Sequence, residues 1–489
     1  MYKLLLCLRY LRTRFIALAC IISVTLGVAT MIVVNSVMSG FGHEMEARMQ
    51  SMISDVVLES RGNGGFPSAE WHMEETKRIL GDDVVGMTPT VHVPALLSLR
   101  VGQETITREI VLIGIDPETY STVSSCDEYL LHPENRQRLD FALREKGFPK
   151  RLPSAGWPHR RRVARREKEL AALYQKQQPP ATSDAPQDDW GVDNEAKVFD
   201  KEREQNPGVV LGIALANYRT ADGQEQFLAT PGDDVQIAFW LAGVTQRTAV
   251  NSDFTIVDFS ESKMSEYDSR FVFVDIKELQ EMRGMIDPTS GVANVSAIQM
   301  KLREGANPNE AREKLRAHFA PELYAASTWR DKQGPLLEAI EMETTILNIL
   351  LFMIIAVAGF GILAIFSMIV VEKTKDIGVL KSLGASSSGV MSIFLGYGLS
   401  LGLVGSGGGM VLGLLFVEYI DSIRHFVEGL SGQQMFDPAI YYFQEIPTLV
   451  EPWTVGWIVI GAMLIAVLAS ILPALRAARL QPVEALRYE

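Results

Sequence analysis

The chain has 489 residues and a formal net charge of −13 at pH 7, and 47% of its residues are hydrophobic. An acidic balance of this size argues against a nucleic-acid-binding protein, which needs a basic surface. Of the three cysteines, Cys7 and Cys20 fall before or inside the first apolar segment, which leaves Cys126 alone in the rest of the chain. We therefore expect no internal disulfide framework.

Four long stretches contain no Asp, Glu, Lys or Arg. They are Phe15–His43, Thr344–Val371, Ser382–Val417 and Pro452–Leu475. Each is longer than the roughly 20 residues that a helix needs to cross the hydrocarbon core of a bilayer. Because lipid cannot satisfy exposed backbone N–H and C=O groups, a helix is the expected form. The sequence predicts a membrane protein with four transmembrane α-helices, one before and three after a long soluble region.

Basic residues near the ends of spans indicate the cytoplasmic side. Lys and Arg gather before the first span, between the second and third, and after the fourth, so we expect both termini in the cytoplasm. The first apolar run is too long for a cleaved signal peptide. The expected segments are an amphipathic N-terminus (1–14), spans at 15–41, 344–371, 389–420 and 452–475, an extracytoplasmic domain (42–343), a cytoplasmic segment (372–388), an outer loop (421–451) and a cytoplasmic tail (476–489).

The region between the first two spans mixes short β-branched or aromatic runs with helical patterns, which predicts an α+β domain. The expected strands are Ala95–Val101, Glu109–Ile115, Val235–Ala242, Phe254–Phe259 and Arg270–Asp275, and the expected helices are Ile276–Gly284 and Asn309–Phe319. Residues 120–206 form a charged insertion that contains the basic run His159–Lys168. That run is either a patch for anionic lipid or an acidic partner or, as we expect, a solvated helix beside a disordered end.

No motif for catalysis or metal binding is present. The chain contains no Gly-Lys dipeptide and hence no Walker A loop, no His-Glu-x-x-His and no Cys-x-x-Cys, and its seven histidines are scattered. We expect no catalytic, cofactor-binding or metal-binding residues, and no enzymatic activity of the chain itself.

The charged segment after the second span contains Ile377, Leu380 and Leu383 at helical spacing, and Gly384 provides a stop. It is either a helix that receives force from a cytoplasmic partner or an ordinary connector on the membrane surface. The third span carries glycines four residues apart, which let helices approach closely, either within the chain or in a second subunit. These glycines are Gly398, Gly402, Gly405, Gly409 and Gly413.

Two asparagines are expected near the outer ends of the first two spans, where polar groups face protein or a wet cavity. They either bond neighbouring helices or line a substrate cavity together with adaptable methionines and a leucine. The residues of this cavity would be Met31, Asn35, Met38, Asn348, Leu350 and Met353.

Several segments resemble the FtsX/MacB-type (type VII) ABC transporter permeases, and within them the lipoprotein-releasing LolC/LolE family. The similar segments are Arg9–Arg14, Leu26–Ala29, Val37–Phe41, Gly114–Pro117, Val210–Ala216, Glu372–Ser386, Ser422–Phe426, Phe436–Tyr442 and Pro473–Glu489. The resemblance implies a MacB-like periplasmic core between the first two spans and a location in the inner membrane. Residues 120–206 depart from the family pattern, as does the short connection between the strands that contain Val235 and Phe254, where some relatives extend a hook toward a carrier.

The resemblance also implies a mechanism. A separate LolD-like ATPase would use ATP and Mg²⁺, and two permease chains, identical or different, would extract lipoproteins from the outer leaflet and pass them to a periplasmic carrier. The ATPase would be coupled through Glu372, Lys373, Asp376, Ile377, Gly378, Leu380, Lys381, Leu383 and Gly384. The alternatives are a MacB-like exporter of small molecules or peptides and FtsX-like signalling to an envelope hydrolase.

Overall fold

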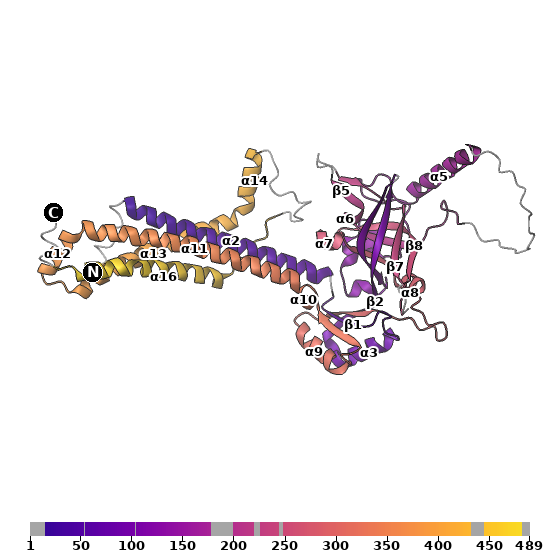
Figure 1. Ribbon diagram of the computed structural model, residues 1–489, viewed down its shortest axis with the longest axis horizontal. Coiled ribbons are helices and arrows are strands. Elements are labelled where there is room, and N and C mark those ends of the chain that lie inside the picture. Colours follow the sequence, from indigo (N-terminus) through magenta and orange to yellow (C-terminus); the bar gives the residue numbers. More distant parts are fainter. Residues whose placement is uncertain are drawn as a thin grey trace, which may run out of the picture. The chain divides into compact units, whose positions relative to one another are not determined.

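The computed structural model describes residues 15–52, 54–102, 104–177, 199–219, 225–243, 248–431 and 445–481. The chain divides into two compact units (Figure 1). The helical unit holds residues up to Ala47 and from Gly334 onward, and the sheet unit holds Arg48–Gln333. The expected N-terminal segment 1–14, and parts of the insertion, outer loop and C-terminal tail, lie outside the described residues.

The helical unit consists of long apolar helices and two short ones. Its elements are α2 (Phe15–Met52), α11 (Gly334–Glu372), α12 (Thr374–Ser382), α13 (Ser387–Glu418), α14 (Ile420–Ser431) and α16 (Pro452–Arg479). Four helices in the described part of the chain, α2, α11, α13 and α16, are long and apolar enough to cross a membrane. Two of them extend well beyond the expected spans: α2 continues to Met52, and α11 already begins at Gly334.

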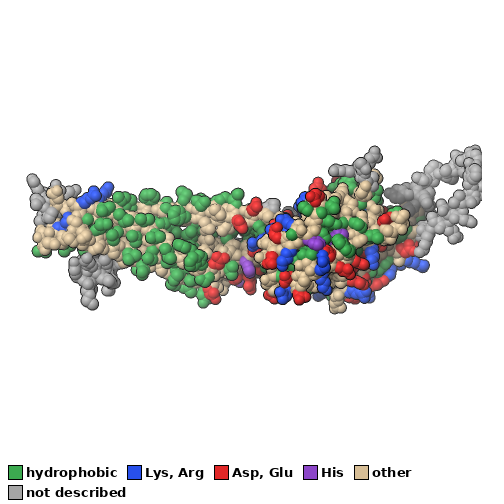
Figure 2. All heavy atoms as spheres, turned by 90° about the horizontal axis from the view of Figure 1, so that it is seen from below, with side chains coloured by type: hydrophobic (Ala, Val, Ile, Leu, Met, Phe, Trp, Pro, Cys, Tyr) green, Lys and Arg blue, Asp and Glu red, His purple; other side chains and the backbone are tan. Residues whose placement is uncertain are grey.

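The surface of the helical unit is predominantly apolar, whereas Asp, Glu, Lys and Arg side chains cover much of the visible face of the sheet unit (Figure 2). Large aliphatic and aromatic side chains on all four long helices are exposed, among them Leu26, Phe360, Leu412 and Leu468. An apolar surface of this extent needs an apolar surrounding, and lipid supplies it. The helical unit is therefore a membrane domain.

The sheet unit combines a mixed sheet with short helices. Its strands are β1 (Val56–Ser60), β2 (Val84–Val101), β3 (Glu104–Ile115), β4 (Gly208–Gly212), β5 (Asn217–Arg219), β6 (Glu225–Phe227), β7 (Asp234–Trp240), β8 (Ala249–Ser260), β9 (Phe271–Asp275), β10 (Ala297–Leu302) and β11 (Tyr324–Thr328). Its α-helices are α3 (Ala69–Leu80), α4 (Pro133–Gln137), α5 (Trp157–Gln177), α6 (Ile213–Ala216), α7 (Ser265–Asp268), α8 (Ile276–Arg283), α9 (Pro308–His318) and α10 (Trp329–Lys332). All five expected strands overlap observed ones, and the two expected helices correspond to α8 and α9.

Six strands close into a ring in the order β2, β3, β9, β4, β8, β7, because β7 also pairs with β2. The other end of β2 pairs with β10, and the sheet continues through β1 to the edge strand β11. Alternate residues of β2, namely Val91, Val93, Leu97 and Leu99, are buried in the core of the unit. This period of two is what a strand with one buried face requires.

The first half of the charged insertion covers the outer face of the ring. Tyr120, Leu130, Phe141 and Leu143 form a second apolar cluster with residues of β3, β4, β8 and β9. The buried carboxylate of Asp258 in β8 binds this part of the insertion to the ring. It accepts hydrogen bonds from the backbone N–H of His132 (3.1 Å) and from Asn135 Nδ2 (2.8 Å). Burial raises the pKa of Asp258. The insertion is thus partly a packed element of the fold.

The basic run lies on α5, and acidic residues of the same chain neutralise much of it. The observed ion pairs are Arg160–Asp234 (2.6 Å), Arg161–Glu145 (2.6 Å), Lys168–Asp200 (3.1 Å) and Lys168–Glu202 (3.0 Å). Arg160 is buried and most other charged residues of α5 are exposed. This arrangement favours the solvated helix over a patch for an anionic ligand.

Candidate functional site

An apolar pocket of about 320 Å³ lies among α2, α11 and α16 of the helical unit. Three of its residues come from the cavity predicted from the sequence: Met31, Asn35 and Asn348. The others are Phe352, Ile355, Thr454, Trp457, Ile458, Gly461, Ala462 and Ile465. Phe352 and Trp457 are more than half exposed, so the pocket is open at the surface of the unit. Its size is at the lower end of the roughly 300–1,000 Å³ typical of ligand pockets.

The remaining three predicted cavity residues lie elsewhere. Leu350 and Met353 are exposed on α11, and Met38 is partly buried on α2 outside the pocket lining. Asn35 donates a hydrogen bond from Nδ2 to the carbonyl oxygen of Met31 (2.9 Å), one turn earlier in its own helix. This bond satisfies part of the amide without a neighbouring helix, so Asn35 can lie beside an apolar space.

Sequence reasoning missed the contribution of α16. Thr454, Trp457, Ile458, Gly461, Ala462 and Ile465 recur at helical spacing and line one side of the pocket. That spacing is a usable signal, but any buried face of a spanning helix has it. Only the packing of α16 against α2 and α11 shows that part of this face is left uncovered.

Helix α12 occupies the position of the predicted coupling segment, and its apolar residues face two ways. Ile377 is 3% exposed and belongs to the core of the helical unit, whereas Leu383 is 81% exposed and Leu380 is also exposed. Gly384 ends the helix with a φ of 95°, a conformation that suits glycine. The three residues therefore do not form a single stripe, and the coupling role of the segment stays a prediction.

Lys381 fixes α12 to the end of α16. Its Nζ donates hydrogen bonds to the carbonyl oxygens of Ala478 (2.8 Å) and Leu480 (2.7 Å). The last carbonyls of a helix have no partner within the helix and carry partial negative charge, which a lysine ammonium satisfies. Because α16 also lines the pocket, this contact links the charged segment to the pocket wall through one helix.

The glycines of α13 lie against two different helices of the same chain. A Cβ added at Gly398 or Gly402 would meet Ser470 or Ala466 of α16 at 2.5 and 3.1 Å. The other three glycines, Gly405, Gly409 and Gly413, face α2, where the nearest atoms to an added Cβ would be those of Val24, Thr25 and Ile32. All five thus occupy close helix–helix contacts within the helical unit. Thr25 Oγ1 donates a hydrogen bond to the carbonyl oxygen of Gly405 (3.0 Å) across one of them.

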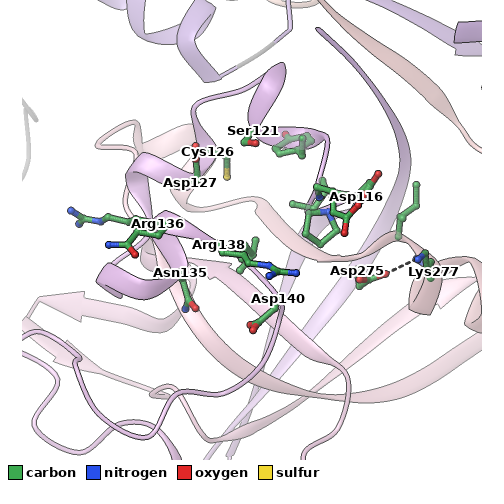
Figure 3. A pocket seen from close by; sticks show the side chains of 17 residues that line it. Asp116, Ser121, Cys126, Asp127, Asn135, Arg136, Arg138, Asp140, Asp275 and Lys277 are labelled. Atoms are coloured by element: carbon green, nitrogen blue, oxygen red, sulfur yellow. Dashed lines mark hydrogen bonds between the residues drawn. The ribbon is translucent and has the colours of Figure 1, made fainter. Parts of the chain in front are cut away.

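The sheet unit has a polar pocket of about 530 Å³ between the insertion and the start of α8 (Figure 3). Asp116, Asp140, Asp275, Arg138 and Lys277 are among its charged residues, so both signs of charge are present. Cys126 also lines it, but the thiol is buried, and burial raises its pKa to about 12. Among the described residues, no three His, Cys, Asp or Glu side chains come together as a metal-binding group. The pocket has no arrangement that defines a reaction.

Comparisons with known proteins point to transport. Residues 348–482 match the family described as FtsX-like permease C-terminal. The chain is 24% identical to the lipoprotein-releasing system transmembrane protein LolC of Xylella fastidiosa, over 99% of this chain and 98% of the relative. It is 30% identical to LolC of Neisseria meningitidis over 58% of this chain and 65% of the relative. With LolE of Haemophilus influenzae it shares 22% identity over 95% of this chain and 92% of the relative.

These similarities confirm the resemblance to FtsX-type permeases with LolC and LolE relatives. They support an ABC transporter permease embedded in a membrane, in which ATP is used by a partner subunit. The FtsX-like match includes α12, α13, α16 and most of α11, and therefore most of the pocket lining.

Proposed function

We propose that the chain is the permease subunit of an ABC transporter that extracts lipoproteins from the outer leaflet of the inner membrane. A separate LolD-like ATPase supplies the energy, and a second permease chain, identical or different, completes the membrane core. The observation that carries the proposal is similarity to LolC over nearly the whole chain, which includes the sheet unit as well as the FtsX-like end. Both termini lie in the cytoplasm in this proposal, and the sheet unit lies outside.

The proposed route of force begins at α12. The exposed residues Leu380 of α12 and Leu383, directly after the helix, dock on the ATPase, while Ile377 and Lys381 hold the helix to the bundle. Substituting both docking residues, Leu380→Asp and Leu383→Asp, should abolish ATPase stimulation without unfolding the permease, because neither side chain is buried. Stimulation that remains at the wild-type level in the assembled complex would exclude this docking face. The variant Ile377→Asp serves as the contrast, since a carboxylate in the core should destabilise the bundle itself.

The apolar pocket is the proposed contact for the acyl chains of the lipoprotein. Gly461 lines it, and no atom lies within 4 Å of a Cβ added there, so we expect Gly461→Leu to place its side chain in the open space of the pocket. Gly456 is an equally open glycine of α16 outside the pocket lining, which makes Gly456→Leu the matched control. We expect the first variant to release less lipoprotein from membrane vesicles to a soluble carrier than the second. Equal release of lipoprotein by the two variants would show that the pocket does not contact the acyl chains.

Depletion of the chain tests the substrate class. Lipoproteins destined for the outer membrane should accumulate in the inner membrane, as measured by fractionation. If lipoprotein sorting is unchanged and sensitivity to drugs or peptides is altered, the chain is an exporter instead. If sorting and sensitivity are unchanged and the chain co-purifies with an envelope hydrolase, it transmits a signal.

A further inference from the structure

We propose that α14 is a membrane-surface helix whose exposed apolar edge, Phe426 and Leu430, inserts into the headgroup region of the lipid bilayer. The two side chains are four residues apart, on one side of the helix, and are 70% and 73% exposed. The assignment requires only that α13 spans the membrane, and it is independent of what the permease carries.

The outward side of α14 differs from that of a helix on the surface of a water-soluble protein, because it carries large apolar side chains and no Asp, Glu, Lys or Arg. The other apolar residues are turned inward: Ile420 is buried, and Ile423 and Val427 are partly buried. The charged residues Asp421, Arg424 and Glu428 lie on the side turned toward the protein, and Arg424 is buried. Phe426 and Leu430, in contrast, point outward. In water this arrangement exposes apolar surface, whereas at a bilayer surface the same edge is buried in lipid.

Contacts on the polar side set the direction in which the apolar edge points. Arg424 Nη2 lies 3.4 Å from Asp421 Oδ1, and the same carboxylate oxygen accepts a hydrogen bond from the backbone N–H of Ile446 (3.2 Å). Three residues later, the N–H of Leu449 donates to the carbonyl oxygen of Ser36 in α2 (2.8 Å). The segment that α14 binds is therefore attached to a spanning helix, and the helix is held rather than free to rotate.

The place of α14 in the helical unit matches the edge of the hydrocarbon layer. The helix begins two residues after α13 ends at Glu418, the first charged residue beyond the uncharged run of that span. It runs across the direction of the long helices (Figure 1), which is the direction of the membrane plane if they cross the bilayer. An amphipathic helix at this depth and in this direction is what interfacial binding requires.

Lipid is a better occupant of this edge than a protein partner for two reasons. The exposed apolar edge continues the surface that leads to it, where Leu412 and Phe416 of α13 and Tyr419, directly after that helix, are also exposed. The exposed apolar edge also carries no Asp, Glu, Lys or Arg that would give a protein partner an electrostatic match.

Spin-label accessibility in the full chain tests the proposal. Cysteine would be introduced at position 426 or 430 by Phe426→Cys or Leu430→Cys, in a Cys7→Ser background, because the native Cys20 and Cys126 are buried. His425→Cys is the matched control, since His425 is also exposed but borders the polar side, where its Nδ1 lies 3.7 Å from Glu428 Oε2. The labelled protein would be placed in nanodiscs of phosphatidylethanolamine and phosphatidylglycerol, and collision rates with oxygen and with a water-soluble nickel chelate would be compared.

We expect the ratio of oxygen to nickel collisions to be several-fold higher at 426 and 430 than at 425, because oxygen concentrates in lipid. Equal ratios at the three positions would overturn the proposal. Protection of positions 426 and 430 from both reagents would also overturn the proposal. If this protection disappears when each nanodisc holds one chain, a second copy of the chain covers the apolar edge. If the protection persists, another part of the same chain covers the edge.

Discussion

The glycines of α13 allow a prediction with an internal control, the pair Gly409→Ala and Gly407→Ala. A Cβ at position 409 would lie 2.7 Å from the carbonyl oxygen of Thr25 and 2.7 Å from Val28 Cβ, closer than atoms tolerate without movement. At position 407 no atom lies within 4 Å. Both substitutions gain the same helix propensity, about 1 kcal/mol in soluble hosts, so this gain cancels in the comparison. The remaining difference is the packing cost of forcing α13 away from α2, about 1–3 kcal/mol.

Thermal unfolding of the purified full chain measures this difference. At roughly 2–4 °C per kcal/mol for a unit of this size, the apparent Tm of Gly409→Ala should fall roughly 2–12 °C below that of Gly407→Ala. Equal melting temperatures would show that α13 and α2 can accommodate the added methyl group, and would refute the close contact at Gly409. A lower value for Gly407→Ala would mean instead that its open face is covered by a second chain.

Three further predictions concern other elements. Lys381→Met removes both hydrogen bonds to the end of α16 and should reduce cargo-stimulated ATPase activity of the assembled complex, whereas Lys375→Met, at an exposed position on α12, should not. Burial raises the pKa of Asp268 to about 6 from an ordinary 3.8, so folding favours the protonated carboxyl, and this stabilisation is lost as the pH rises from about 4 through 6. Chemical denaturation should show that the free energy of unfolding falls by about 2–3 kcal/mol between pH 4 and pH 7. Asp268→Asn should abolish this loss. Cys126 should resist maleimide at pH 7.5 until denaturant is added, because burial raises its pKa to about 12.

The apolar runs predicted the long helices well but not their ends. The absence of charge reports which residues face lipid, whereas the helix continues for as long as its residues tolerate helical geometry. Residues 44–52 and 336–343 contain mainly Glu, Met, Ala, Leu and Arg, which are good helix formers, so α2 and α11 extend past the uncharged runs. The strands were recognisable because runs of β-branched and aromatic residues are a local signal.

The pocket could be predicted only in part. Asn35 and Asn348 were noticeable as polar groups in apolar spans, and the structure does place both at one pocket. Leu350 and Met353 are close to Asn348 in sequence, but positions two and five residues away lie about 200° and about 140° around a helix, so both are exposed on another side of α11. Trp457 and Gly461 come from a helix more than 400 residues away from Asn35 in the chain, and no local pattern reveals such a contact.

The long strand β2 has a mechanical consequence. Its residues Val84–Thr90 pair with β10 and Ala95–Ser98 pair with β7, so one unbroken backbone belongs both to the closed ring and to the smaller sheet beside it. Bending between these two parts would require breaking ladder hydrogen bonds in mid-strand, whereas loops carry no such penalty. The sheet unit should therefore move as one rigid body. Any conformational change during a transport cycle should then occur in segments outside the sheet unit.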